Sequence, residues 1–206
     1  LRHPTIFQVS CLYGSLRCAK YMLMNGASVK CVNDAKENSA VYAIIGGNIE
    51  IIRLIEQKNV QFTNMLFVTA SYHKHELFNW LSNYDDINDT LNEKGLTVNY
   101  SCIKSNNFIG LAKCNECPTE LLGYTVLHEA AKRGRASMLK YLLQNQHNAA
   151  YLNMPDSAGL TPIAYAAKRG KFSAFKYLLK INGINLNIRD NTGKTIFFHA
   201  ASSSNK

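Results

Sequence analysis

One short pattern is written twice in the second half of this chain, and it constrains the fold more than any other feature. Gly-Tyr-Thr-Val-Leu-His-Glu-Ala-Ala-Lys-Arg-Gly begins at Gly123, and Gly-Leu-Thr-Pro-Ile-Ala-Tyr-Ala-Ala-Lys-Arg-Gly begins 36 residues later at Gly159. Each copy continues into a second apolar segment, at 138–143 and 174–179. A repeat period in this range is typical of solenoids, in which similar units stack on one another. We therefore expect a series of stacked repeats.

The residues of the second copy predict a pair of short helices. Thr161 is a natural N-cap because its hydroxyl can accept from a free backbone N–H, and Pro162 follows where proline loses no hydrogen bond. Gly170 ends this helix by adopting a left-handed conformation. The next helix presents Phe175 and Leu179 at helical spacing. Neither helix is long enough to be stable alone, so each unit is expected to depend on its neighbours.

These residues resemble the ankyrin repeat. Its Thr-Pro-Leu-His-x-Ala-Ala signature is matched in residues 125–131 and 161–167. A third copy begins at Gly193, in which Phe198 takes the histidine position of the family and His199 the variable position. The resemblance implies an all-α fold, an ankyrin-repeat solenoid of about six stacked helix-turn-helix units, some of them without hairpins. It also implies that His128 makes structural hydrogen bonds near its helix start.

The same frame extends over the whole chain with uneven strength. Residues 1–59 read as two fair repeats, 60–122 as degenerate repeats, and 123–206 as strong repeats of which the last is truncated. A chain whose middle repeats are degenerate in this way resembles the divergent ankyrin-like proteins of protists. We expect 1–206 to be a single ankyrin-like solenoid, a fragment of a longer chain, with a local kink or mobile link within 60–122.

The net charge of +9 lies entirely in the second half of the chain. Residues 1–122 carry eleven Lys and Arg against eleven Asp and Glu, whereas residues 123–206 carry twelve against three. Such a surplus favours an acidic partner, whether a protein, nucleic acid or an anionic surface. A basic face that only keeps the chain soluble explains it equally well.

The cysteines and the hydropathy indicate an intracellular protein. Six cysteines fall mostly inside helical patterns, as expected for reduced thiols rather than a disulfide framework. No apolar run approaches the roughly 20 residues of a membrane-spanning helix. No secretion signal is visible at Leu1, so we expect a cytoplasmic location without a membrane span. The oligomeric state is left open.

Motifs for catalysis or metal binding are weak. Cys114-Asn-Glu-Cys117 could share a zinc ion, but the nearest further ligands, Cys102 and His128, stand at no standard spacing. The pair His73-x-His75 reads as a surface turn between paired helices.

The acidic doublet Asp85-Asp86 lacks the alternation of a calcium loop. Phosphate-loop, nucleophile-elbow and zinc-protease motifs do not occur in the sequence. We therefore predict no enzyme active site, no metal and no cofactor.

Two basic doublets mark the ends of the first helices of the strong repeats. Lys132-Arg133 returns as Lys168-Arg169, at the helix end where cations suit the dipole, so capping explains part of this choice. Stacking would place the doublets side by side in a basic ledge, joined by Arg135, Lys171 and Lys176. Partners of ankyrin proteins usually lie against the first helices and hairpin tips of the concave side. The resemblance therefore implies a partner-binding set of Glu129, Lys132, Arg133, Asp156, Ser157, Tyr165, Lys168, Arg169, Asn191, Thr192 and His199.

The function predicted from these features is that of a protein–protein interaction scaffold. Its partner would be another protein, with an acidic surface if the charge surplus is functional. Two alternatives stay open. The repeats could regulate an enzyme encoded in the same longer chain, or the basic ledge could bind nucleic acid, although it lacks a recognition helix and an exposed aromatic platform.

Overall fold

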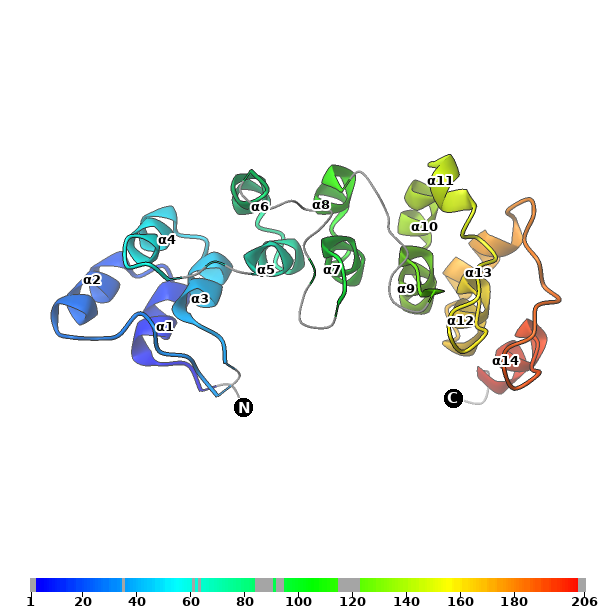
Figure 1. Cartoon of the computed structure of the whole chain (residues 1–206), viewed down its shortest axis with the longest axis horizontal. Coiled ribbons are helices and arrows are strands. Elements are labelled where there is room, and N and C mark those ends of the chain that lie inside the picture. Colours follow the sequence, from blue (N-terminus) through cyan, green and yellow to red (C-terminus); the bar gives the residue numbers. More distant parts are fainter. Residues whose placement is uncertain are drawn as a thin grey trace. The chain divides into compact units, whose positions relative to one another are not determined.

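The computed structural model describes residues 3–34, 36–60, 62, 64–83, 91, 95–114 and 123–203. The regular elements in these ranges are helices, and most of them form pairs of successive helices joined by short turns (Figure 1). Across the same ranges, β pairing is limited to isolated bridges between Leu91 and Thr97 and between Arg189 and Thr195. The expected all-α fold is confirmed. No helix in the described part of the chain is long and apolar enough to cross a membrane.

The chain divides into two compact units, residues 1–87 and 88–206. The described helices of unit 1 form three pairs: α1 (Ile6–Leu12) with α2 (Leu16–Met24), α3 (Ser39–Gly46) with α4 (Ile49–Glu56), and α5 (Met65–Ser71) with α6 (His75–Leu81). The first helices α1, α3 and α5 pack in sequence, and α2 packs against α4. Unit 1 is therefore a stack of helix pairs.

Unit 2 repeats the arrangement. Its described helices are α7 (Val98–Ser105) with α8 (Phe108–Lys113), α9 (Val126–Arg133) with α10 (Ala136–Leu142), the short α11 (Gln146–Ala149), α12 (Pro162–Lys168) with α13 (Phe172–Leu179), and α14 (Ile196–Ser203). The first helices again form a row, in which α9 contacts α7 and α12, and α12 contacts α14. The boundary between the units falls within 60–122, and the continuity of the solenoid across that segment stays a prediction.

The helix starts and stops follow from local chemistry. The Thr161 hydroxyl accepts from the N–H of Ala164, with Pro162 at the first helical position, and Asn38 caps α3 in the same way. Gly134 and Gly170 adopt positive φ where the first helices end. The Ala-Ala pairs of the signature are buried where α9 and α12 pack, because small side chains let two helices approach closely. Each of these helix boundaries was predictable from a few neighbouring residues.

Candidate partner-binding surface

His128 ties two successive repeats of unit 2 together. The backbone N–H of Thr125 donates to Nδ1 of His128 at 3.0 Å, and Nε2 lies 3.0 Å from the carbonyl oxygen of Leu160 in the next repeat. Because a carbonyl oxygen can only accept, Nε2 carries the proton and the ring is neutral. Burial lowers the pKa of His128 to about 4. The structural role predicted for this histidine is confirmed.

Tyr165 and His199 fix the hairpins of their own repeats. The Tyr165 hydroxyl donates to Asp156 Oδ2 at 2.7 Å, and His199 Nε2 lies 2.9 Å from Asp190 Oδ2. The other oxygen of each aspartate accepts backbone N–H groups of the hairpin turn. The Thr192 hydroxyl and then these backbone N–H groups hold the pKa of Asp190 well below its usual range. Each hairpin is thereby held against its first helix.

The hairpin tips of adjacent repeats are also joined. Asn191 donates its backbone N–H to the carbonyl oxygen of Ala158 at 3.1 Å and its side-chain amide to that of Ser157 at 2.8 Å. Gly159 makes this approach possible: its φ is +76°, and a Cβ there would lie 2.6 Å from Asn191 Oδ1. The tip residues of the predicted set thus form one connected edge, with Ser157, Asn191 and Thr192 exposed.

Glu129 lies beneath the surface and holds the residues above it. Its side chain is fully buried, and it accepts hydrogen bonds from the Tyr124 hydroxyl at 2.6 Å and from Nε of Arg133. The Lys132 ammonium lies 4.0 Å from the same carboxylate. Burial, and then the hydrogen bond to Glu129, raise the pKa of Tyr124 above its usual range. A buried carboxylate needs such partners, so Glu129 positions surface residues instead of facing solvent, and His199 is buried likewise.

An aromatic pair supports Lys132 on the first-helix side. The Lys132 ammonium lies 5.5 Å from the ring centroid of Tyr124 and 5.7 Å from that of Tyr165. Tyr124 stacks on His128, with 5.3 Å between centroids, and meets Tyr165 edge to face at 5.7 Å. Tyr124 was not among the residues predicted from the sequence. The signal available was a tyrosine directly before the cap Thr125, where the next repeat has leucine.

The basic doublets converge on one concave feature, which we call the basic hollow. It has a volume of about 390 Å³ and is lined by Lys132, Arg133, Arg135, Arg169 and Lys171. Five of the seven residues of the expected basic ledge therefore meet, whereas Lys168 and Lys176 do not line the hollow. Lys168 is exposed, and the Lys176 ammonium lies 5.9 Å from the ring centroid of Phe172.

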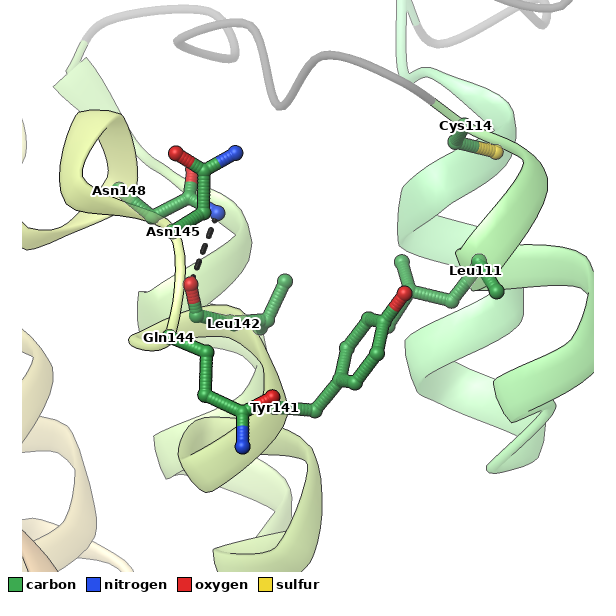
Figure 2. Close-up of a pocket in the computed structure, with 8 residues that line it drawn as sticks. Leu111, Cys114, Tyr141, Leu142, Gln144, Asn145 and Asn148 are labelled. Atoms are coloured by element: carbon green, nitrogen blue, oxygen red, sulfur yellow. Dashed lines mark hydrogen bonds between the residues drawn. The ribbon is translucent and has the colours of Figure 1, made fainter.

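A second hollow, of about 350 Å³, lies between α8 and the segment α10–α11 (Figure 2). Tyr141 projects into it toward Leu111, and the side-chain amide of Asn148 donates to the carbonyl oxygen of Leu142 at 3.0 Å. Cys114 is the one lining residue with a thiol, and the remaining side chains are apolar or carry amides and a phenol. The lining thus offers neither a carboxylate nor a cation for catalysis or charge recognition.

Only some of the residues considered as weak metal ligands lie in the part of the chain that the structure describes. Cys117 and the doublet Asp85-Asp86 lie outside the described residues. Cys102 is buried, and a hydrogen bond with Cys114, followed by burial, raises the pKa of its thiol far above its usual value. His73 is exposed, with φ +56°, in the turn between α5 and α6, as predicted, whereas His75, predicted in the same turn, is the half-buried first residue of α6. In the ranges that the structure describes, no three His, Cys, Asp or Glu side chains are grouped to hold a metal ion.

Comparisons with known proteins agree with this geometry. The family model described as "Ankyrin repeats (3 copies)" matches residues 127–206. The ankyrin repeat domain of human ASB11 is similar over 96% of this chain and 92% of its own, with a TM-score of 0.73 and 18% identity. The ankyrin repeat domain of Bcl-3, titled a unique member of the IkappaB protein family, is similar over 97% and 95%, with a TM-score of 0.63 and 15% identity. No curated protein matches the sequence.

Proposed function

We propose that this chain, which has the fold of an ankyrin repeat domain and whose residues 127–206 belong to the ankyrin repeat family, is a scaffold that binds an acidic protein. Membership of a family of protein-interaction modules supports a binding role in general. The basic hollow supports the acidic partner. Its five cations have Glu129 as their one ion-pairing carboxylate among the described residues, so most of their charge is available to a ligand.

The binding surface would be the first-helix side of unit 2 together with its hairpin tips. Direct contacts are assigned to the accessible members of the predicted set, namely Lys132, Arg133, Ser157, Tyr165, Lys168, Arg169, Asn191 and Thr192. Glu129, Asp156 and His199 act from beneath, where they hold Arg133, the hairpin turn and Asp190 in place. The binding role therefore separates into residues that touch the partner and residues that position them.

The mechanism is recognition by a surface that is already formed. Hydrogen bonds between hairpins and helices fix the tips before a partner arrives, which reduces the entropy lost on binding. The uncompensated positive charge steers an acidic protein toward the hollow and raises the association rate. Screening by salt weakens this steering. The affinity is therefore expected to fall as the ionic strength rises.

Charge reversal tests the proposal. The variant K132E/R133E/K168E/R169E should lose the partner that the wild-type chain captures, measured by affinity pull-down followed by titration of the purified partner. Because it removes both cations paired with the buried Glu129, circular dichroism verifies its folding, and K168E/R169E, which leaves those pairs intact, should lose part of the binding. The matched control K113E/K140E/K176E/K180E makes the same change in charge on residues that do not line the hollow. It should retain most of the binding. Equal capture by the wild type and the first variant would refute the proposed surface.

A further inference from the structure

We propose that the basic hollow is a site for a phosphorylated serine or threonine side chain of the partner. This inference rests on the proposed function, because it assumes a protein partner with negative charge. It goes further by naming the chemical group that fills the hollow. Three observations support it: the way the cations are brought together, the lack of acceptors for them, and the shape of the site.

The backbone brings cations from two repeats to one point. Gly134 ends α9 with φ +75°, so that Arg133 and Arg135 stand on either side of the turn. The aliphatic stem of Lys171, from the next repeat, packs over this glycine, where a Cβ would lie 3.1 Å from Lys171 Cδ. Arg169 lines the hollow from the end of α12. The convergence depends on a glycine that leaves room for the Lys171 stem.

Three of these five cations lack a carboxylate partner within the described part of the chain. Glu129 binds Arg133 and lies near Lys132, but Arg135, Arg169 and Lys171 have no carboxylate partner among the described residues. The Nε of Arg135 is shielded from solvent and makes no hydrogen bond with any of those residues. Because Nε is closed to water, a ligand in the hollow would reach Arg135 at its terminal nitrogens, which no carboxylate of the described residues occupies.

A phosphoryl group matches this arrangement better than a carboxylate. It carries close to two negative charges near neutral pH and three strong acceptor oxygens, so it can serve several donors at once. Guanidinium groups bind it through paired hydrogen bonds, and three of the five lining residues are arginines. A glutamate side chain offers two oxygens and a single charge.

The hollow also fits a single phosphoryl group better than a nucleic acid. Nucleic acid binding requires a track of cations along the backbone and open aromatic faces for bases. The cations here line one hollow, and the two rings beside Lys132 are already engaged: Tyr124 stacks on His128, and Lys132 lies over Tyr124 and Tyr165. The geometry therefore favours a phosphopeptide over RNA or single-stranded DNA.

The test uses three labelled peptides of the sequence Ala-Glu-Gly-Xaa-Gly-Glu-Ala, in which Xaa is phosphoserine, glutamate or serine. Fluorescence anisotropy should show the phosphoserine peptide binding roughly ten-fold or more tightly than the glutamate peptide, as expected for additional charge-assisted hydrogen bonds. In NMR titrations, the phosphoserine peptide should shift the Nε–Hε resonance of Arg135. A labelled oligouridylate, measured in the same way, tests for nucleic acid binding.

Two variants locate the binding. R135Q/K171Q should reduce phosphoserine-peptide binding to the level of the serine peptide, whereas K140Q/K180Q, which removes the same charge elsewhere in unit 2, should leave it unchanged. R135K keeps the charge without the planar fork and should bind with intermediate affinity. Circular dichroism melts verify that each variant is folded.

Equal binding of the phosphoserine and glutamate peptides would overturn the inference, as would full binding by R135Q/K171Q or tighter binding of oligouridylate. These results leave the proposed function standing if the charge reversal still abolishes partner capture. Conversely, phosphopeptide binding in the hollow combined with normal partner capture by the charge-reversed variant would refute the proposed partner surface. It would also refute that the phosphoryl group belongs to that partner, while the hollow would remain a phosphoryl-binding site.

Discussion

The first repeat of unit 1 and the first strong repeat of unit 2 make a similar hydrogen bond to the segment that follows them, but with different side chains. Gln8 and His128 stand at the same position after their cap threonines. Gln8 Nε2 donates to the carbonyl oxygens of Cys31 and Glu37 in the following segment, both at 3.1 Å, much as His128 reaches the Leu160 carbonyl. In these two repeats a side-chain donor reaches the following segment, and either an amide or an imidazole can provide it.

The two repeats differ more at the surface than in these internal bonds. At the N-cap of the second helix, unit 1 has Ser15 where unit 2 has Arg135. The whole surplus of positive charge lies within residues 123–206, all of them in unit 2. Because the first repeat forms its helix pair without such cations, the fold does not require them. The difference supports a binding role for the basic hollow.

Removing the side chain that donates a hydrogen bond to the following segment, His128 or Gln8, should give the largest effect on stability. H128A is expected to destabilise unit 2 by about 2–4 kcal/mol, because it leaves a cavity and takes the acceptor from the Thr125 N–H. The Leu160 carbonyl oxygen loses one donor but keeps the N–H of Asp156. Q8A should cost unit 1 about 1–3 kcal/mol, since the Cys31 carbonyl oxygen loses its donor and the Thr5 N–H loses its acceptor. Hydrogen exchange of the whole chain, read by mass spectrometry, assigns each loss to its unit. A loss that spread equally over both units would contradict the local role of these bonds.

Acidification should weaken unit 2 selectively. The pKa of His128 is lowered from 6.5 to about 4 in the folded state, so the unfolded chain binds the additional proton between these values. The stability contributed by the neutral ring is therefore complete above pH 6.5 and lost progressively as the pH falls toward 4, by up to about 3 kcal/mol.

The variant H128Q, which carries the residue of unit 1, supplies the control for this pH dependence. It should keep a neutral donor and flatten the dependence over the same range. Urea denaturation at a series of pH values compares it with the wild type. An unchanged slope in H128Q would assign the pH dependence to other groups.

Alanine substitutions at two glycines distinguish the cost of backbone strain from the cost of steric crowding. Gly159 in unit 2 and Gly26 in unit 1 both have positive φ, but a Cβ at Gly159 would lie 2.7 Å from the backbone nitrogen of Asn191, whereas Gly26 has open space around it. G159A should cost about 2–3 kcal/mol and loosen the joined hairpin tips, while G26A should cost about 1 kcal/mol from strain alone. Thermal melts rank the two, and equal costs would show that the tips separate easily.

Exchanging the N-cap residue should change stability least. R135S places the residue of unit 1 in unit 2, where the side chain of Arg135 makes no ion pair among the described residues. The stability should change by less than about 0.5 kcal/mol, as is usual for surface positions. Binding of the phosphoserine peptide should fall at the same time. A large loss of stability would instead mean that Arg135 serves the fold.

Much of the fold was predictable because its signals are local. Thr161, Pro162 and Gly170 start and end a helix through contacts within a few residues, and the signature predicted the hydrogen bond between His128 and Thr125 but not the one to Leu160 in the next repeat. The candidate site was predictable only in part. Glu129 stands in the variable position of the signature, which suggested a contact residue, but its hydrogen bonds to Tyr124 and Arg133 turn it inward.

The sequence by itself determined the repeat, the helix boundaries and the location of the charge surplus, since each depends on residue type and spacing along the chain. The tertiary structure decided which cations meet. Lys171 reaches the basic hollow because its stem packs over Gly134 of the preceding repeat, and Arg135 lines the hollow without a carboxylate partner among the described residues. Such contacts depend on how two repeats approach in space, and spacing along one repeat does not contain that information.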